Sequence, residues 1–136
     1  MPARGDAVSP RVPVSWGELL DKITILEIKS ERLTTEAARA NASSELWLLW
    51  KEVGVAASGN LLCVADQMAA LREVNGRLWD LENIVRGKEA QQQFDNTFIE
   101  AARAIYRNND ERARFKREIN AILQSAIIEE KEHAYV

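Results

Sequence analysis

A polar stripe in the middle of the chain carries residue types suited to binding an anion. Six residues between positions 68 and 86 recur at intervals of four and three, which places them on one helix face: Met68, Arg72, Asn75, Trp79, Glu82 and Arg86. An arginine guanidinium is a planar fork of donors that matches a carboxylate or a phosphate, and an asparagine amide adds a donor and an acceptor. This stripe therefore has the chemistry to hold the anionic group of a ligand.

A second polar group interrupts an apolar pattern further along the chain. If residues 97–124 form one helix, its inward face comprises Phe98, Ala102, Ile105, Asn109, Arg112, Lys116, Ile119 and Leu123. Asn109, Arg112 and Lys116 then fall in the middle of an otherwise apolar face. Because an unpaired buried charge costs several kcal/mol, such residues are paired, hydrated or functional.

Three interpretations of these polar residues remain open. The first is a cleft between helices for an anionic ligand or partner, lined by Lys22, Arg72, Asn75, Trp79, Arg86, Asn109, Arg112 and Lys116. The second is a network of ion pairs between helices, in which Glu18, Glu82 and Asp110 neutralise those cations. The third breaks the last helix at Asp110, which then caps a new helix and leaves Asn108 and Asn109 in a turn.

The cleft interpretation admits more than one function. We expect a binding or interaction module first. The alternative is a cofactor-free, all-helical enzyme acting on a carboxylate- or phosphate-bearing substrate, similar in architecture to the helical chorismate mutases, which hold a dicarboxylate with Arg and Lys. Glu82 is the one good candidate for a titratable group facing such a ligand, and hence the one candidate catalytic residue. A purely structural oligomerisation domain is the second alternative.

The acidic residues near the start of the chain do not support a metal site. Glu18, Asp21, Glu27 and Glu31 invite comparison with the all-helical, magnesium-dependent nucleotide pyrophosphatases. Glu27 and Glu31 nevertheless fall on a different helix face from Glu18, so one ion could hardly contact all of them. We therefore expect no metal and no cofactor.

Composition limits the remaining classes. The chain has 136 residues with a formal net charge of −3, so no global basic field would attract nucleic acid or an acidic membrane. With a single cysteine, Cys63, and a single histidine, His133, neither an intramolecular disulfide nor a Cys/His zinc site is expected. No apolar run approaches the roughly 20 residues of a membrane span. We expect a cytoplasmic protein.

Helices are the elements that must position these residues. Helical periodicity predicts segments from Ser15 to about Leu33, from about Glu36 to Val53, over residues 61–90 and over residues 97–124. Residues 1–13 contain all three prolines and are predicted to be a disordered or extended lead-in, and residues 14–136 a single domain. The predicted fold class is all-α, an antiparallel bundle of four to five helices with the first helix central.

The first helix has two apolar faces. Ile25 and Ile28 lie opposite the stripe of Leu19, Ile23 and Leu26, which predicts that this helix is buried between neighbours or between subunits. Trp47 and Trp50 add apolar surface that a monomer of this size struggles to cover. These features predict a homodimer.

Several blocks of the sequence together resemble a small all-helical domain family of bacteria and phages whose function is unknown. The blocks are PVSWGELLDKITILEIK (Pro13 to Lys29), VNxxLWxxE (Val74 to Glu82), FIxxARxxY (Phe98 to Tyr106), NDERAxxKRxIN (Asn109 to Asn120) and IEEK (Ile128 to Lys131). The resemblance implies a helical fold, and it places the motif residues on the two faces described above. Asn83 stands where the family pattern has an acidic residue, which weakens a mechanism based on paired carboxylates.

Overall fold

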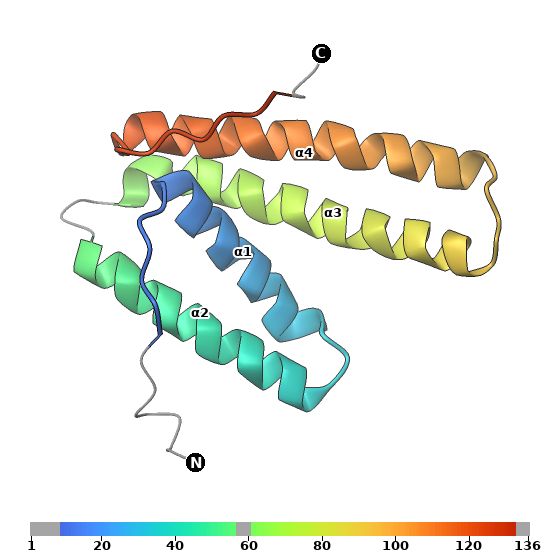
Figure 1. The fold of residues 1–136 in the computed structure, drawn as a ribbon, viewed down its shortest axis with the longest axis horizontal. Coiled ribbons are helices and arrows are strands. Elements are labelled where there is room, and N and C mark those ends of the chain that lie inside the picture. The colour runs from blue at the N-terminus through green and yellow to red at the C-terminus, as the bar shows by residue number, and fades with distance from the viewer. Residues whose placement is uncertain (1–8, 57–60, 133–136) are drawn as a thin grey trace.

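The described residues of the chain are helical or irregular and contain no β-strand. The computed structural model describes residues 9–56 and 61–132, which form α1 (Trp16–Arg32), α2 (Glu36–Ala56), the short 3₁₀ helix η2 (Leu61–Val64), α3 (Ala65–Ala90) and α4 (Asn96–Ile122) (Figure 1). The predicted all-α class is confirmed. Of the expected lead-in, residues 1–8 lie outside the described residues, and residues 9–13 are exposed and not helical. None of the described helices combines the length and hydropathy required to cross a membrane.

Short polar side chains determine where two of the helices begin. The Ser15 hydroxyl accepts the Glu18 N–H at 3.0 Å, and the Asp95 carboxylate accepts the Phe98 N–H at 3.0 Å. From Asp95 onward, α4 is continuous to Ile122. The proposed break at Asp110 is therefore wrong, because the three polar residues at 108–110 keep helical geometry and bond from within the helix.

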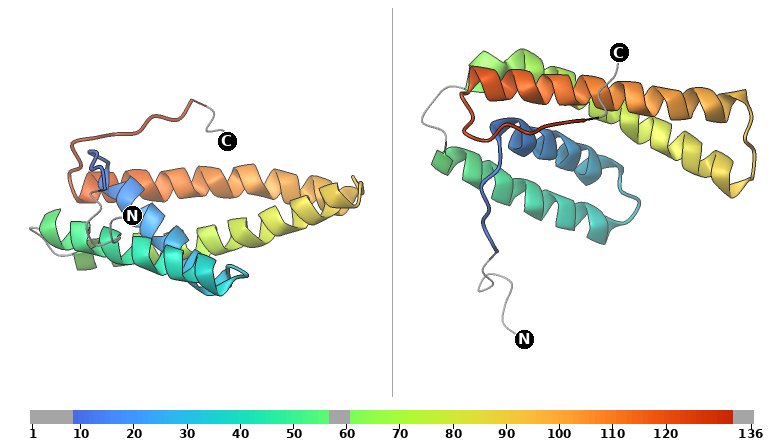
Figure 2. Two further views of the ribbon diagram at one scale, coloured as in Figure 1. Left: turned by 60° about the horizontal axis from the view of Figure 1, so that its bottom comes forward. Right: turned by 45° about the horizontal axis from the view of Figure 1, so that its top comes forward.

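The long helices α3 and α4 form an antiparallel hairpin, and α1 lies between this hairpin and α2 (Figures 1 and 2). Helix α1 contacts α2, α3 and α4, whereas α2 contacts α1 alone among the described helices. The far part of the hairpin extends beyond α1, so the side chains there have fewer neighbours.

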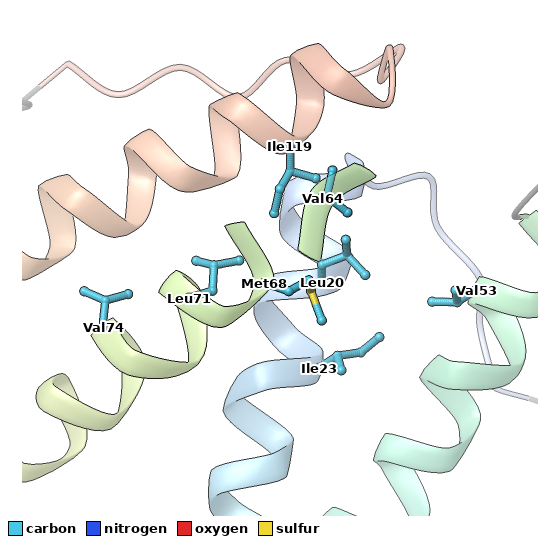
Figure 3. Packing of buried hydrophobic residues seen from close by; sticks show 8 residues of the cluster. All are labelled: Leu20, Ile23, Val53, Val64, Met68, Leu71, Val74 and Ile119. Carbon is cyan, nitrogen blue, oxygen red and sulfur yellow. The ribbon is translucent and has the colours of Figure 1, made fainter. Parts of the chain in front are cut away.

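An apolar cluster fills the space where α1 meets the hairpin and α2 (Figure 3). Its members are Leu20, Ile23, Val53, Val64, Met68, Leu71, Val74 and Ile119. Burial of each such side chain is worth about 1.5–3 kcal/mol, so this cluster is the main source of stability. The second apolar face of α1 is only half-buried at Ile25 and Ile28.

The start of α1 packs directly against the backbone of α4. A Cβ atom at Gly17 would lie 2.4 Å from the carbonyl oxygen of Lys116 and 2.9 Å from Oδ1 of Asn120. The Gly17 N–H instead donates to Asn120 Oδ1 at 2.7 Å. Glycine is therefore required at this position by the close approach of the two helices.

The segment after α4, residues 123–132, turns back and runs alongside that helix (Figures 1 and 2). Gln124 makes the turn with a positive φ of 53°, and the Ser125 N–H donates to the Asn120 carbonyl at 2.8 Å, which closes the helix end. We call residues 123–132 the C-terminal segment.

Candidate functional site

A buried carboxylate, Asp21, lies at the centre of the polar residues. Its side chain is 1% exposed. Arg112 binds this carboxylate in a bidentate, side-on geometry: Nε donates to Oδ1 at 2.9 Å and Nη2 to Oδ2 at 2.5 Å. The hydrogen bond to Asp21 raises the pKa of Arg112 despite the opposing effect of burial. This ion pair connects α1 to α4 in an environment of low dielectric constant.

Asn75 adds a third helix to this ion pair. Its Nδ2 atom donates to Asp21 Oδ1 and to Thr24 Oγ1, both at 2.9 Å, while Thr24 Oγ1 donates to the Asp21 carbonyl at 2.7 Å. Asp21, Thr24 and Asn75 are all buried. Their polar groups are thus satisfied by one another, which is the condition under which such groups can be buried at low cost.

Lys116 lies one helical turn beyond Arg112 and connects α1 to the C-terminal segment. Its Nζ atom contacts Glu18 Oε2 at 2.6 Å and Glu129 Oε2 at 3.2 Å, and the Ser15 hydroxyl donates to Glu129 Oε1 at 2.5 Å. Burial opposes the charge on Lys116, but the hydrogen bond and charge of Glu18 outweigh it and raise the pKa of Lys116.

The pKa of Glu129 moves in the opposite direction. Burial would raise it, but the Ser15 hydrogen bond and the charge of Lys116 are among the interactions that together lower it. A further ion pair, Lys131 Nζ to Asp110 Oδ1 at 2.6 Å, attaches the C-terminal segment to the middle of α4.

A cleft of about 460 Å³ opens beside this network, between α1, α3 and α4. Its apolar lining consists of Ile25, Ile28, Leu78 and Trp79. Its polar and charged lining consists of Asn75, Glu82, Asn83, Arg86, Asn109 and Arg112. An apolar pocket of this size with a few convergent polar groups is the usual form of a small-molecule site.

The structure brings together six of the residues that the sequence indicated as candidates. They are Asn75, Trp79, Glu82, Arg86, Asn109 and Arg112, all of which line the cleft. At its opening, Arg86 Nε donates to Glu82 Oε2 at 3.2 Å within α3, and the Arg86 side chain is 80% exposed.

The other three candidates lie elsewhere. Lys22 faces α2 and pairs with Glu45 at 3.4 Å, and Arg72 pairs with Glu27 at 3.1 Å. Lys116 lines a separate hollow of about 360 Å³, together with Asn109, Arg112, Ala113 and Lys131.

The cleft and the ion-pair network therefore coexist in one molecule. Each of the five cations named from the sequence has a carboxylate partner. Of the three partners expected from the sequence, Glu18 pairs with Lys116, Glu82 with Arg86, and Asp110 with Lys131. The most buried partner, Asp21 with Arg112, was not among them.

A signal for Asp21 was present in the sequence. Asp21, Ile25 and Ile28 are spaced by four and three, so the acidic residue belongs to the second apolar face of the first helix. A carboxylate on such a face requires a buried partner, and the interrupted face of the last helix supplies Arg112. Glu129 and Lys131 belong to the IEEK block of the family resemblance, but spacing gave them no partner, because the irregular C-terminal segment has no periodicity.

The described part of the chain contains no group of three or more His, Cys, Asp or Glu residues that could hold a metal ion. His133 lies outside the described residues. The carboxylates close to the cleft are instead occupied by Arg and Lys.

Comparison with known proteins identifies one family. No curated protein and no solved structure matches the chain. A family model described as a family of unknown function, DUF6165, matches residues 10–135, which include α1, α3, α4 and the C-terminal segment, and therefore every residue of the network and the cleft. The chain belongs to this family of unknown function, DUF6165.

Proposed function

We propose that this protein is a binding module that holds a small organic anion in the cleft between α1, α3 and α4. The observation that carries the proposal is the way in which Asp21 holds Arg112. Asp21 occupies the edge formed by Nε and Nη2, and Nη1 donates to Asn109 Oδ1 in a long hydrogen bond of 3.5 Å, so two of the five N–H groups remain available to a second acceptor. Arg112 lines the cleft, and its side chain is 29% exposed.

The remainder of the cleft suits a ligand with an apolar or aromatic body. Trp79, Ile25 and Ile28 provide an apolar surface, and Asn83 and Asn109 can hydrogen-bond polar groups of the ligand, whereas the Nδ2 atom of Asn75 is committed to Asp21 and Thr24. We therefore expect a carboxylate or phosphate group directed at Arg112, with the rest of the ligand lying against Trp79.

Arg86 is the cation of this site that can change its side-chain conformation when a ligand binds. Its ion pair with Glu82 is exposed, and such pairs are worth about 0–1 kcal/mol, so a ligand can displace it at little cost. Arg86 can then turn toward the anion as a second cation. Arg112 cannot turn in this way, because doing so would leave Asp21 buried without a partner.

The test is a thermal-shift screen of aromatic and aliphatic carboxylates and phosphate esters, followed by calorimetric titration of any hit. A ligand at 100 times its Kd stabilises the native state by about 2.7 kcal/mol. Arg86→Gln should weaken binding without a large change in stability. Arg114→Gln is the matched control, because Arg114 makes the same kind of exposed i,i+4 pair, with Glu118, away from the cleft. Equal affinities of the two variants would contradict the proposal.

A second proposal concerns assembly: we infer that the chain forms a homodimer through the outer face of α2. Trp47 and Leu48 are 61% and 44% exposed, and Trp50 is 39% exposed, although α2 already contacts α1 on its other face. Exposed aromatic residues clustered on one helix are typical of a protein interface. Light scattering at high concentration should give a dimer mass for the wild type and a monomer mass for Trp47→Glu. A monomeric wild type would refute the inference.

A further inference from the structure

The hollow beneath the C-terminal segment has a different character from the cleft. It measures about 360 Å³, and Asn109, Arg112, Ala113, Lys116 and Lys131 line it. Three of these five residues are cations and none is acidic, whereas the lining of the cleft includes Glu82. We call this space the tail hollow.

Each of the three cations pairs with at least one carboxylate, and none of them uses all of its N–H donors in doing so. Lys116 uses two of its three ammonium protons, on Glu18 and Glu129, and Lys131 uses one, on Asp110. Arg112 donates to Asp21 through Nε and Nη2 and to Asn109 Oδ1 through Nη1 at 3.5 Å, which leaves two of its five N–H groups. Cations that line one hollow from different elements therefore retain donors for a further acceptor.

The chain itself supplies a precedent for such an acceptor. The Glu129 carboxylate already receives hydrogen bonds from Lys116 and from the Ser15 hydroxyl, on the boundary of the same region. Of the two donors that hold Glu129, only Lys116 also lines the hollow, where it retains one further proton for a carboxylate.

We propose that the tail hollow is a second anion site, specific for the carboxylate of a small molecule and formed by Lys116, Lys131 and Arg112. A carboxylate is favoured over a phosphate dianion because Asp21, Glu18, Asp110 and Glu129 surround the three cations, and a second negative charge would meet their repulsion. The site is separate from the cleft, although Asn109 and Arg112 line both. Arg112 offers the same donors to both spaces, so Lys116 and Lys131, which do not line the cleft, are the residues that make the hollow a site of its own.

The site adds a role for the C-terminal segment. Lys131 is the only one of the three cations that comes from outside α4, so the segment must be in place for the site to exist. Glu129 competes for Lys116 from the same segment. The segment therefore both completes the site and limits its affinity.

The experiment is an NMR titration of the full chain with benzoate, followed through backbone amide shifts. Benzoate should shift the amides of residues 113–116 and 131, which belong to the hollow and not to the cleft, whereas binding in the cleft alone would shift those of residues 78–86. Benzamide has the same shape without the charge and should produce no shift at either group. Inorganic phosphate should bind more weakly than benzoate.

Three variants decide the assignment. Lys131→Gln should weaken benzoate binding about tenfold, the value of one charge-assisted hydrogen bond. Lys88→Gln removes a comparable Lys–Asp pair, with Asp95, and should leave binding unchanged. Glu129→Gln should tighten binding several-fold, because a competing negative charge is removed.

The Glu129 variant also separates a binding site from a structural clamp. A purely structural ion pair predicts that Glu129→Gln loosens the C-terminal segment and gains no affinity for benzoate. That outcome would overturn the proposal, as would equal benzoate affinities of the Lys131 and Lys88 variants or tighter binding of phosphate. Arg86→Gln should leave this site intact, so failure here is distinguishable from failure of the cleft proposal.

Discussion

The two ends of the α3–α4 hairpin use the same residue types in different ways. At the end covered by α1 and the C-terminal segment, Arg112 and Lys116 are 29% and 16% exposed, and each makes several charge-assisted hydrogen bonds. Toward the far end, Arg86 and Arg103 are 80% and 51% exposed, and each pairs with one glutamate on its own helix. Burial of the cation and the number of its partners, not the type of residue, distinguish a structural cation from one that can change partners.

The sequence presented an ion-pair network and an open cleft as alternatives, and the structure contains both side by side. Arg112 and Lys116 are held by carboxylates within the protein and keep only part of their donors free. The cleft opens beside them, between the second apolar face of α1 and the hairpin. That it holds an anion is our proposal.

The largest effect is expected at the buried end, from Arg112→Met. This change leaves the Asp21 carboxylate buried without its guanidinium and should destabilise the protein by about 3–5 kcal/mol in chemical denaturation. The double variant Asp21→Leu/Arg112→Met removes both charges and should recover most of that loss. If the single variant keeps native stability, the buried pair is not structural and the contrast between the two ends fails.

The next effect is steric and concerns the contact between α1 and α4. Gly17→Ala places a Cβ atom 2.4 Å from the Lys116 carbonyl, so the helices must separate, at a cost of about 1–3 kcal/mol. Gly76→Ala is the control, since nothing lies within 4 Å of its Cβ, and it should stabilise α3 by about 0.5–1 kcal/mol. Thermal unfolding of both variants should show shifts of opposite sign. Equal shifts in the unfolding temperature would contradict the close approach of Gly17 to the Lys116 carbonyl.

A smaller effect should appear as pH dependence at the C-terminal segment. Since the pKa of Glu129 is lowered in the folded protein, its contribution to stability is present above the ordinary value of 4.5 and is lost as pH falls through the folded value. The pKa of Lys116 is raised in the folded protein. Its contribution to stability is therefore present below the ordinary value of 10.5 and is lost as pH rises through the folded value. Glu129→Gln should therefore reduce the loss of stability on acidification. An unchanged acid profile would exclude Glu129 from the network.

The smallest effect is expected at the exposed end. Arg86→Gln and Glu82→Gln each break only an exposed pair and should change the free energy of unfolding by less than about 0.5 kcal/mol. Denaturant titration measures this directly. A loss comparable to that of Arg112→Met would show that exposure does not separate the two ends.

The sequence predicted the helices and much of the cleft, and the reasons are physical. Residues spaced by four and three lie on one face of a helix, so the spacing along α3 and α4 was enough to group the polar residues by face. Asn75, Trp79, Arg86 and Arg112, which the sequence indicated in this way, all line the cleft. Spacing does not say which faces of different helices meet. Lys22 was therefore grouped with the cleft although it faces α2.

The sequence predicted which residues share a helix face better than it predicted which charged residues form ion pairs. Arg112 was recognised as a cation that needs a partner, but the expected partners were Glu18, Glu82 and Asp110, because spacing alone does not show that Asp21 on α1 faces Arg112 on α4. Glu129 and Lys131 lie in an irregular segment whose path depends on the turn at Gln124, and local sequence does not determine that path.

The hydrogen bonds at the start of α1 have a consequence for synthesis of the chain. Ser15, Trp16 and Gly17 bond to Glu129, Ser125 and Asn120, across separations of 114, 109 and 103 residues. While the chain emerges from the ribosome, the first helix is made early and its final partners are made late. Until residues 120–129 have emerged, the start of α1 lacks these hydrogen bonds, and before α4 is made Asp21 lacks Arg112 and the apolar cluster lacks Ile119. A nascent chain halted before α4 should therefore be a better substrate for chaperones and proteases than a chain that includes residues 96–132.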